Sequence, residues 1–111
     1  FGKTIGSFEG VSFMLAEMAT ELQAARELVY STAVLKDTGS PETSVRCAMS
    51  KYYAAEMCNR VAYKAVQVFG GYGYIKGYKV ERLYRDARIT SIYEGTSQIQ
   101  QIVISNSLLR D

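Results

Sequence analysis

The sequence predicts an all-α protein, built as an up-and-down bundle of four helices. Apolar residues recur at steps of three and four along most of the 111 residues, which is the spacing of one face of an α-helix. No segment alternates apolar and polar residues as a half-buried strand does. Glycine, proline and short polar clusters separate the periodic segments, so neighbouring helices joined by short turns are the simplest arrangement.

The first helix is expected over residues 8–36, ending before Thr38 and Gly39. One apolar stripe runs along it, made of Val11, Leu15, Met18, Leu22, Ala25 and Val29. A second helix is expected to begin at Ser40, Pro41 and Glu42. A serine can cap free amides there, and a proline suits the first helical position because it lacks an N–H.

The stripe of the second helix contains many small residues, which would let a neighbouring helix approach closely. Its members are Val45, Ala48, Tyr52, Ala55, Asn59, Ala62, Val66 and Phe69. Gly70 is the predicted C-terminal cap, because glycine takes the left-handed conformation that often ends a helix. Residues 70–77 (GGYGYIKG) hold four of the nine glycines and are expected to form a loop.

Two shorter helices are expected over residues 80–87 and 96–109, with residues 89–95 between them. In this connection Glu94 stands just before a helix start, where free N–H groups favour an anion or a polar cofactor. The simpler alternative is that Glu94 or Thr96 is an ordinary N-cap.

The composition narrows the class of function. With 48% hydrophobic and 22% charged residues the chain resembles one globular domain. A net charge of +2 with scattered basic residues argues against a nucleic-acid partner. The absence of an apolar run of membrane-spanning length argues against membrane insertion. There is no histidine, so proton chemistry would fall to a carboxylate, lysine or tyrosine, and no metal site is expected. Cys47 and Cys58 are expected to be reduced core thiols.

Three blocks together resemble the C-terminal signature of the acyl-CoA dehydrogenases, in order and in spacing. They are QVFGGYGY at 67–74, VERLYRDARI at 80–89 and IYEGTSQIQ at 92–100. The start, FGKTI, and FMLAEM at 13–18 also resemble the opening of that family's C-terminal helical domain. The resemblance therefore covers nearly all of residues 1–111. It does not include the N-terminal helical and middle β-domains of the family.

This resemblance implies an FAD-dependent dehydrogenation of acyl-CoA. Glu94 would be the catalytic base that removes the α-proton, while the β-hydride passes to the flavin and a trans-2-enoyl-CoA forms. The backbone N–H of Glu94 would bind the thioester carbonyl, and Tyr93 and Gly95 would line the substrate site.

The resemblance also implies two cofactor-binding segments. Gln67, Val68, Phe69, Gly70 and Gly71 would contact the FAD of a neighbouring subunit. Thr96, Ser97 and Gln98, at the start of the last helix, would contact the flavin too. Charged residues of the middle block are expected to be structural; they are Arg82, Arg85, Asp86 and Arg88.

The partners implied by the resemblance are an acyl-CoA substrate, an electron-transfer flavoprotein and other copies of the chain, as a dimer or tetramer. The location would be the bacterial cytoplasm or the mitochondrial matrix. Two alternatives stay open: an acyl-CoA oxidase of the same superfamily, and a non-catalytic helical module that serves only for association. The 111-residue fragment alone is expected to be inactive.

Overall fold

The computed structural model describes residues 1–110, in which every regular element is a helix. After a 3-10 turn at Ile5–Ser7, the helices are α1 (Glu9–Asp37), α2 (Thr43–Phe69), α3 (Gly71–Tyr74), α4 (Lys79–Ile89) and α5 (Ser97–Leu108). The all-α prediction is confirmed, and the four predicted helices correspond to α1, α2, α4 and α5. No helix in this part of the chain combines the length and the apolar character needed to cross a membrane.

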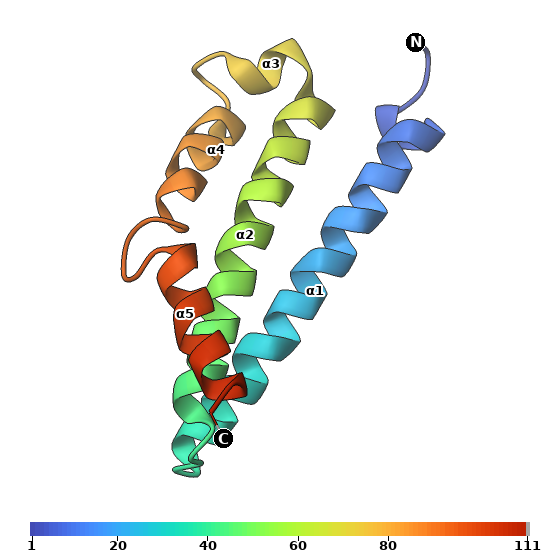
Figure 1. The fold of residues 1–111 in the computed structure, drawn as a ribbon. Helices are drawn as coiled ribbons and strands as arrows, with labels where there is room; N and C mark the ends of the chain where they lie inside the picture. Colours follow the sequence, from blue (N-terminus) through green and yellow to red (C-terminus); the bar gives the residue numbers. More distant parts are fainter. Residues whose placement is uncertain (111) are drawn as a thin grey trace.

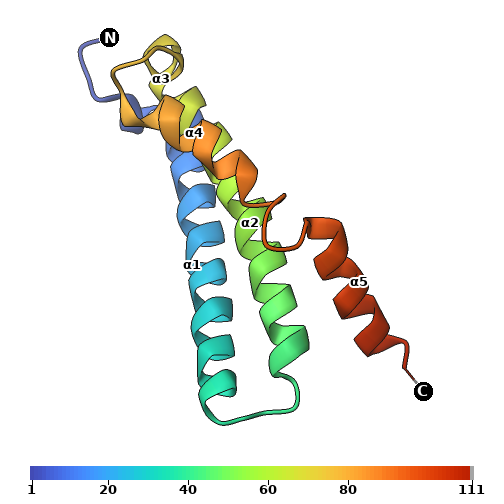
Figure 2. The same ribbon diagram turned by 90° about the vertical axis from the view of Figure 1, so that its left-hand side faces the viewer.

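The helices form three columns in an elongated domain of 60 × 24 × 24 Å (Figures 1 and 2). Helices α1 and α2 are an antiparallel hairpin, and α4 and α5 follow one another back along α2. The third and fourth predicted helices are therefore arranged end to end, so α2 packs against every other helix of the domain. Their connection, which carries Glu94, lies beside the middle of α2.

The turn between α1 and α2 corrects one prediction. Ser40, Pro41 and Glu42 were expected to start the second helix, but α2 begins at Thr43. The Glu42 amide donates to the Ser40 hydroxyl at 3.3 Å, and the Thr43 amide donates to the Ser40 carbonyl at 3.1 Å. Ser40 thus closes the turn that precedes the helix, because a serine side chain can accept from a turn amide as well as from a helix amide.

The core consists mostly of small side chains. Ala25, Ala48, Ala55, Ala87 and Met57 are buried, and the described residues include no large side chain that is fully buried. Ala48 and Ala55, small residues of the predicted α2 stripe, belong to this core. Neither cysteine is in a disulfide, and the prediction that both are core thiols is wrong for Cys47, which is exposed.

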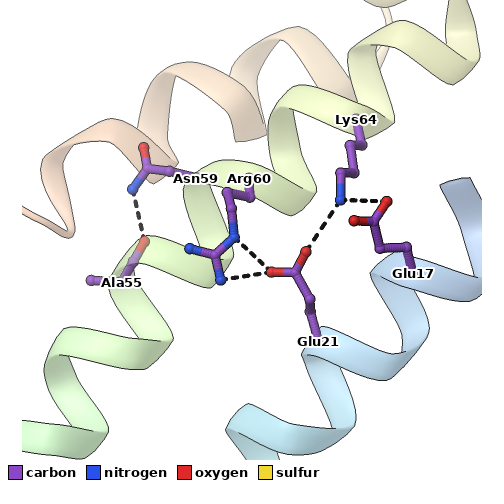
Figure 3. A network of polar contacts seen from close by, with 6 residues as sticks. All are labelled: Glu17, Glu21, Ala55, Asn59, Arg60 and Lys64. Carbon is purple, nitrogen blue, oxygen red and sulfur yellow. Dashed lines mark hydrogen bonds and ion pairs between the residues drawn. The ribbon is translucent and has the colours of Figure 1, made fainter.

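An ion-pair network joins the upper halves of α1 and α2 (Figure 3). The Arg60 guanidinium lies 2.7 Å from the Glu21 carboxylate, and the Lys64 ammonium lies 3.2 Å from Glu21 and 2.8 Å from Glu17. Desolvation raises the pKa of Glu21, but the hydrogen bonds and charges of Arg60 and Lys64 outweigh it and lower the pKa below 4.5. The hydrogen bond to Glu17 and the second one to Glu21 raise the pKa of Lys64 above 10.5.

Candidate active site

Glu94 lies in the turn between α4 and α5 and has an unusual backbone conformation. Its φ is 53°, and it is the one non-glycine residue among 1–110 with a positive φ. Gly95 follows with a φ of 85°. A left-handed glutamate is uncommon, and such conformations persist where the surroundings hold them. The turn is therefore defined by contacts outside itself.

Two side chains hold the carbonyl groups of this turn. The Lys51 ammonium, on α2, donates to the Gly95 carbonyl at 2.6 Å. The Gln100 amide, on α5, donates to the carbonyls of Glu94 and Gly95 at 3.3 and 3.2 Å. In a trans peptide the C=O and N–H point in opposite directions. The N–H groups of Gly95 and Thr96 therefore face away from Lys51 and Gln100.

Three successive amides of the turn have no acceptor within residues 1–110. They are the N–H groups of Glu94, Gly95 and Thr96. Thr96 is the N-cap of α5, since its hydroxyl accepts from the Ile99 amide at 3.3 Å. The alternative that Glu94 is that cap is wrong. Because the Glu94 carboxylate is exposed and accepts no hydrogen bond from the described residues, it is available to a bound molecule.

A polar hollow of about 440 Å³ adjoins the start of α5. Thr96, Ser97 and Gln98 line it together with Glu56, Asn59, Arg88, Ser91 and Ile92. Ser97 is 5% exposed, and both of its donors are engaged: its hydroxyl with Glu56 at 2.5 Å and its amide with the Ser91 carbonyl at 3.0 Å. Ser97 therefore anchors α5 to α2. The other two residues predicted to contact flavin here, Thr96 and Gln98, have backbone amides with no acceptor in residues 1–110.

Tyr93 lines a second hollow, of about 240 Å³, on the same connection. Lys51 lines it too, and its other walls are Ala54, Ala55, Cys58 and Thr90. Tyr93 is half exposed, at 51%. Of the residues predicted for substrate and base, Tyr93 therefore lines a hollow, whereas Glu94 and Gly95, which follow it in the same turn, line neither of the two.

The other predicted cofactor segment lies elsewhere. Gln67, Val68 and Phe69 end α2, Gly70 follows, and Gly71 begins α3, at the end of the domain beyond α4 (Figure 1). Helix α4, about 16 Å long for its 11 residues, separates this segment from the Glu94 turn. Within one chain the two predicted cofactor segments are therefore not brought together.

The glycines of this second segment serve different purposes. Gly70 has a φ of 60° and ends α2, as predicted. The expected loop at 70–77 instead contains the helical turn α3. Gly73 packs against the end of α2, where a Cβ would lie 2.6 Å from the Val66 carbonyl oxygen. At Gly71 a Cβ would meet nothing within 4 Å. Nothing in residues 1–110 therefore demands a glycine at position 71.

Sequence reasoning missed a set of polar side chains on α2, which we name the loop-facing set: Lys51, Tyr52, Glu56 and Asn59. Each contacts the α4–α5 connection or α5. Besides the Lys51 and Glu56 contacts above, Asn59 donates to the Thr90 hydroxyl at 3.3 Å, and Gln101 donates to the Tyr52 hydroxyl at 3.1 Å. Tyr52 and Asn59 belong to the stripe of small residues that the sequence predicts for this helix. The available signal is the helical spacing of the set, since residues 52 and 56 are four apart and residues 56 and 59 are three apart.

The chain belongs to the acyl-CoA dehydrogenase family: residues 1–109 match the family described as "Acyl-CoA dehydrogenase, C-terminal domain". The C-terminal helical domain of this family, predicted from the sequence, is thereby confirmed.

Several relatives are close. The chain is 56% identical over 110 residues to the caffeyl-CoA reductase–Etf complex subunit CarC of Acetobacterium woodii, and 50% identical to a short-chain-specific acyl-CoA dehydrogenase of Clostridium acetobutylicum. Each match covers 99% of this chain and 29% of the relative. Butyryl-CoA dehydrogenase from Megasphaera elsdenii has the same fold, with a TM-score of 0.95 and 48% identity over 99% of this chain and 28% of that one. The chain therefore spans less than a third of the length of these proteins.

Proposed function

We propose that this chain supplies the catalytic base and part of the cofactor site of an FAD-dependent acyl-CoA dehydrogenase. The observation that carries the proposal is the turn at Glu94. The Glu94 side chain is exposed, its backbone φ is positive, and the amides of Glu94, Gly95 and Thr96 have no acceptor in residues 1–110. Removal of a proton beside a thioester carbonyl requires a base and a donor that stabilises the charge on the carbonyl oxygen. Glu94 offers both, in its carboxylate and in its backbone N–H.

The reaction balances with one base and one hydride acceptor. The Glu94 carboxylate takes the α-proton, and the Glu94 N–H stabilises the charge that develops on the thioester oxygen. The electron pair of the α-C–H bond becomes the new double bond, as the β-hydrogen leaves with its two electrons. FAD, when bound, supplies the acceptor for that hydride. Tyr93, which lines the hollow of about 240 Å³, and Gly95, which follows Glu94 in the turn, are proposed to line the acyl-thioester.

The residues present fit FAD at both predicted segments. Thr96 and Gln98 offer free amides at the N-terminus of a 12-residue helix, which suits a phosphate or another polar part of the cofactor. At Gly71 the space beside the backbone is open, which suits the close approach of a flat cofactor. Because α4 separates the segments, we propose that Gln67, Val68, Phe69, Gly70 and Gly71 act on the FAD of a neighbouring subunit.

Exposed apolar side chains support a homo-oligomer and further domains around this one. Phe13, Tyr30 and Val34 on α1 are each more than 60% exposed, and Leu108 on α5 is 70% exposed. A surface of this kind is typical of a domain that is covered by other protein. We propose that a dimer or tetramer, with the remaining domains of the enzyme, covers it, in the bacterial cytoplasm or the mitochondrial matrix. The name of the 56% identical relative supports an electron-transfer flavoprotein as redox partner.

The same relative favours a second possibility, catalysis in the opposite direction. It is named a reductase, and reduction of an enoyl-CoA uses the same groups in reverse. Protonated Glu94 would then donate to Cα, after hydride transfer to Cβ.

The test is flavin bleaching by acyl-CoA in the full-length flavoprotein that carries this domain, with Glu94→Gln compared to wild type. We expect Glu94→Gln to retain FAD and to bleach at least about 100-fold more slowly, because a positioned base contributes 10² or more. Glu42→Gln is the matched control, since Glu42 is an exposed acid in the far α1–α2 turn, and it should bleach normally. Undiminished bleaching by Glu94→Gln with FAD bound would move the base to another residue.

A further inference from the structure

The Lys51 contact with the Glu94 turn is unlike the other lysine contacts of α2. Its ammonium donates to the carbonyl oxygen of Gly95, the residue directly after Glu94, at 2.6 Å across 44 residues of sequence. Lys64, on the same helix, instead pairs with two carboxylates of α1. Lys51 has no carboxylate partner among residues 1–110. Its charge is therefore directed at the backbone of the turn.

The turn depends on outside contacts, and Lys51 makes the strongest of them. A glutamate with φ of 53° persists only where its surroundings fix it. The two Gln100 contacts, at 3.3 and 3.2 Å, are long and come from a neutral amide, whereas the Lys51 contact is short and charge-assisted. A charge-assisted hydrogen bond is roughly twice as strong as a neutral one.

The same contact also orients the Thr96 amide, which has no acceptor in residues 1–110. With the Gly95 carbonyl directed at the ammonium, the Thr96 N–H on the same peptide must point the opposite way. A hydrogen bond to the carbonyl also polarises that peptide, which makes its N–H a better donor. Lys51 thus acts on both the direction and the donor strength of the Thr96 N–H, although it lies outside the turn.

We propose, on the basis of the function proposed above, that Lys51 is a positioning residue for Glu94. Its ammonium holds the Gly95 carbonyl so that the Glu94 carboxylate is presented to the α-proton. It acts through the turn and does not touch the reacting atoms. Misplacement of a catalytic group by about 1 Å can cost about 100-fold in rate, so the loss of this contact should be measurable in the proton-removal step.

The experiment uses the full-length holoprotein with Lys51→Met, which keeps the aliphatic stem, and Lys51→Arg, which keeps the charge and a donor. We expect Lys51→Met to retain FAD and to bleach about 10- to 100-fold more slowly, with acyl-CoA affinity changed much less. Acyl-CoA with deuterium at Cα should slow bleaching of Lys51→Met more than bleaching of wild type, because removal of the α-proton becomes rate-limiting in the variant. Lys51→Arg should recover part of the lost rate.

A second readout does not depend on turnover. In amide hydrogen exchange of the same holoprotein, Lys51→Met should exchange faster across residues 92–98, while peptides of α1 stay unchanged. Lys64→Met is the matched control: a partly buried lysine of the same helix, 19% exposed, with partners on α1. It should lower thermal stability and leave bleaching and exchange at 92–98 as in wild type.

The outcomes separate the two proposals. If Glu94→Gln stops bleaching but Lys51→Met bleaches and exchanges like wild type, Lys51 is not a positioning residue and the proposed function stands. If Lys51→Met loses acyl-CoA affinity with no change in the bleaching rate at saturation, Lys51 acts on binding and the proposal is overturned. If Glu94→Gln bleaches normally, the proposed function and the Lys51 proposal both fail.

Discussion

Helix α2 carries polar side chains on two faces, and the two groups bind different kinds of partner. Toward α1, Arg60 and Lys64 form ion pairs with Glu21 and Glu17 (Figure 3). Toward α4 and α5, the loop-facing set binds mainly hydroxyl groups and a backbone carbonyl, through contacts such as Lys51 to Gly95 and Asn59 to Thr90. The first group joins two long helices, and the second holds a turn with a glutamate at positive φ.

The difference lies in how precisely each kind of contact defines geometry. Ion pairs between long side chains near the surface tolerate small shifts and are weakened by salt. A hydrogen bond to a carbonyl oxygen fixes the orientation of a whole peptide unit, because the peptide is planar. Changes on the α1 side of α2 should therefore affect stability, and changes on the α5 side should affect activity. Substitutions on each side of α2, and in the turn that α2 holds, can separate these effects on stability and on activity.

The largest of these effects is expected for Gly95→Ala. The alanine would have to adopt a φ of 85°, and its Cβ would lie 2.6 Å from the Gln100 amide nitrogen that holds the turn. Such a φ costs about 1–3 kcal/mol for a residue other than glycine. Displacement of Gln100 would also remove its hydrogen bonds to the Glu94 and Gly95 carbonyls, which would leave the Gly95 carbonyl with Lys51 alone. We expect bleaching by acyl-CoA to fall at least about tenfold, with FAD retained.

Gly39→Ala is the control for Gly95→Ala. Gly39 also has a positive φ, 69°, but an added Cβ would meet nothing within 4 Å, and the residue lies in the far α1–α2 turn. It should lower the thermal midpoint and leave bleaching intact. Equal activity losses in both variants would mean that general destabilisation, and not the geometry of the Glu94 turn, explains the effect.

The sequence predicted those parts of the fold that depend on local chemistry. The spacing of apolar residues predicts the helices, and Gly70 predicts the end of α2, because both follow from the helix period and from glycine's conformational range. The start of α2 was misplaced because Ser40 can close a turn as readily as it caps a helix. The turn α3 was not predicted, because four glycines in eight residues are typical of a loop, and the contact of Gly73 with Val66 is not visible in the sequence.

The candidate site was predictable as a motif but not as a geometry. The resemblance pointed to Glu94, yet nothing in a glutamate indicates a left-handed backbone, which arises from contacts of Lys51 and Gln100. A helical period identifies which residues share a face, but not which face meets which neighbour. Nothing in the sequence therefore distinguishes Lys51 from the other charged residues of α2, whereas the structure places its ammonium against the Gly95 carbonyl.

A smaller effect, on stability alone, is expected for Glu21→Gln. The variant removes the carboxylate that joins Arg60 to Lys64, and we expect a loss of up to about 1 kcal/mol of stability at low salt. Salt should shrink the difference from wild type, because it screens ion pairs near the surface. Bleaching by acyl-CoA should be unchanged. A large activity loss with normal stability would contradict the division between the two faces of α2.

The difference in stability between wild type and Glu21→Gln should depend on pH, with a sign that follows from the pKa of Glu21. The pKa of Glu21 is lowered in the folded state from its ordinary 4.5, so its contribution is complete above pH 4.5 and is lost as pH falls through the folded pKa. The advantage of wild type over Glu21→Gln should therefore be constant near neutrality and disappear in acid. Thermal unfolding from neutral pH to below pH 4 checks this. An advantage that grew on acidification would contradict the lowered pKa.

The smallest effect is expected for Arg85→Ala, on the outer face of α4. Arg85 pairs with Glu81 at 3.0 Å, one helical turn away, but its side chain is 68% exposed. Exposed pairs at this spacing contribute about 0.5 kcal/mol or less, so neither the thermal midpoint nor bleaching should change measurably. Arg85 differs in this from Arg88, which donates to the Ser91 hydroxyl at 2.6 Å and lines the hollow beside α5. A clear activity loss in Arg85→Ala would show that α4 meets another domain or the substrate, and that the polar residues with functional contacts extend beyond the two faces of α2.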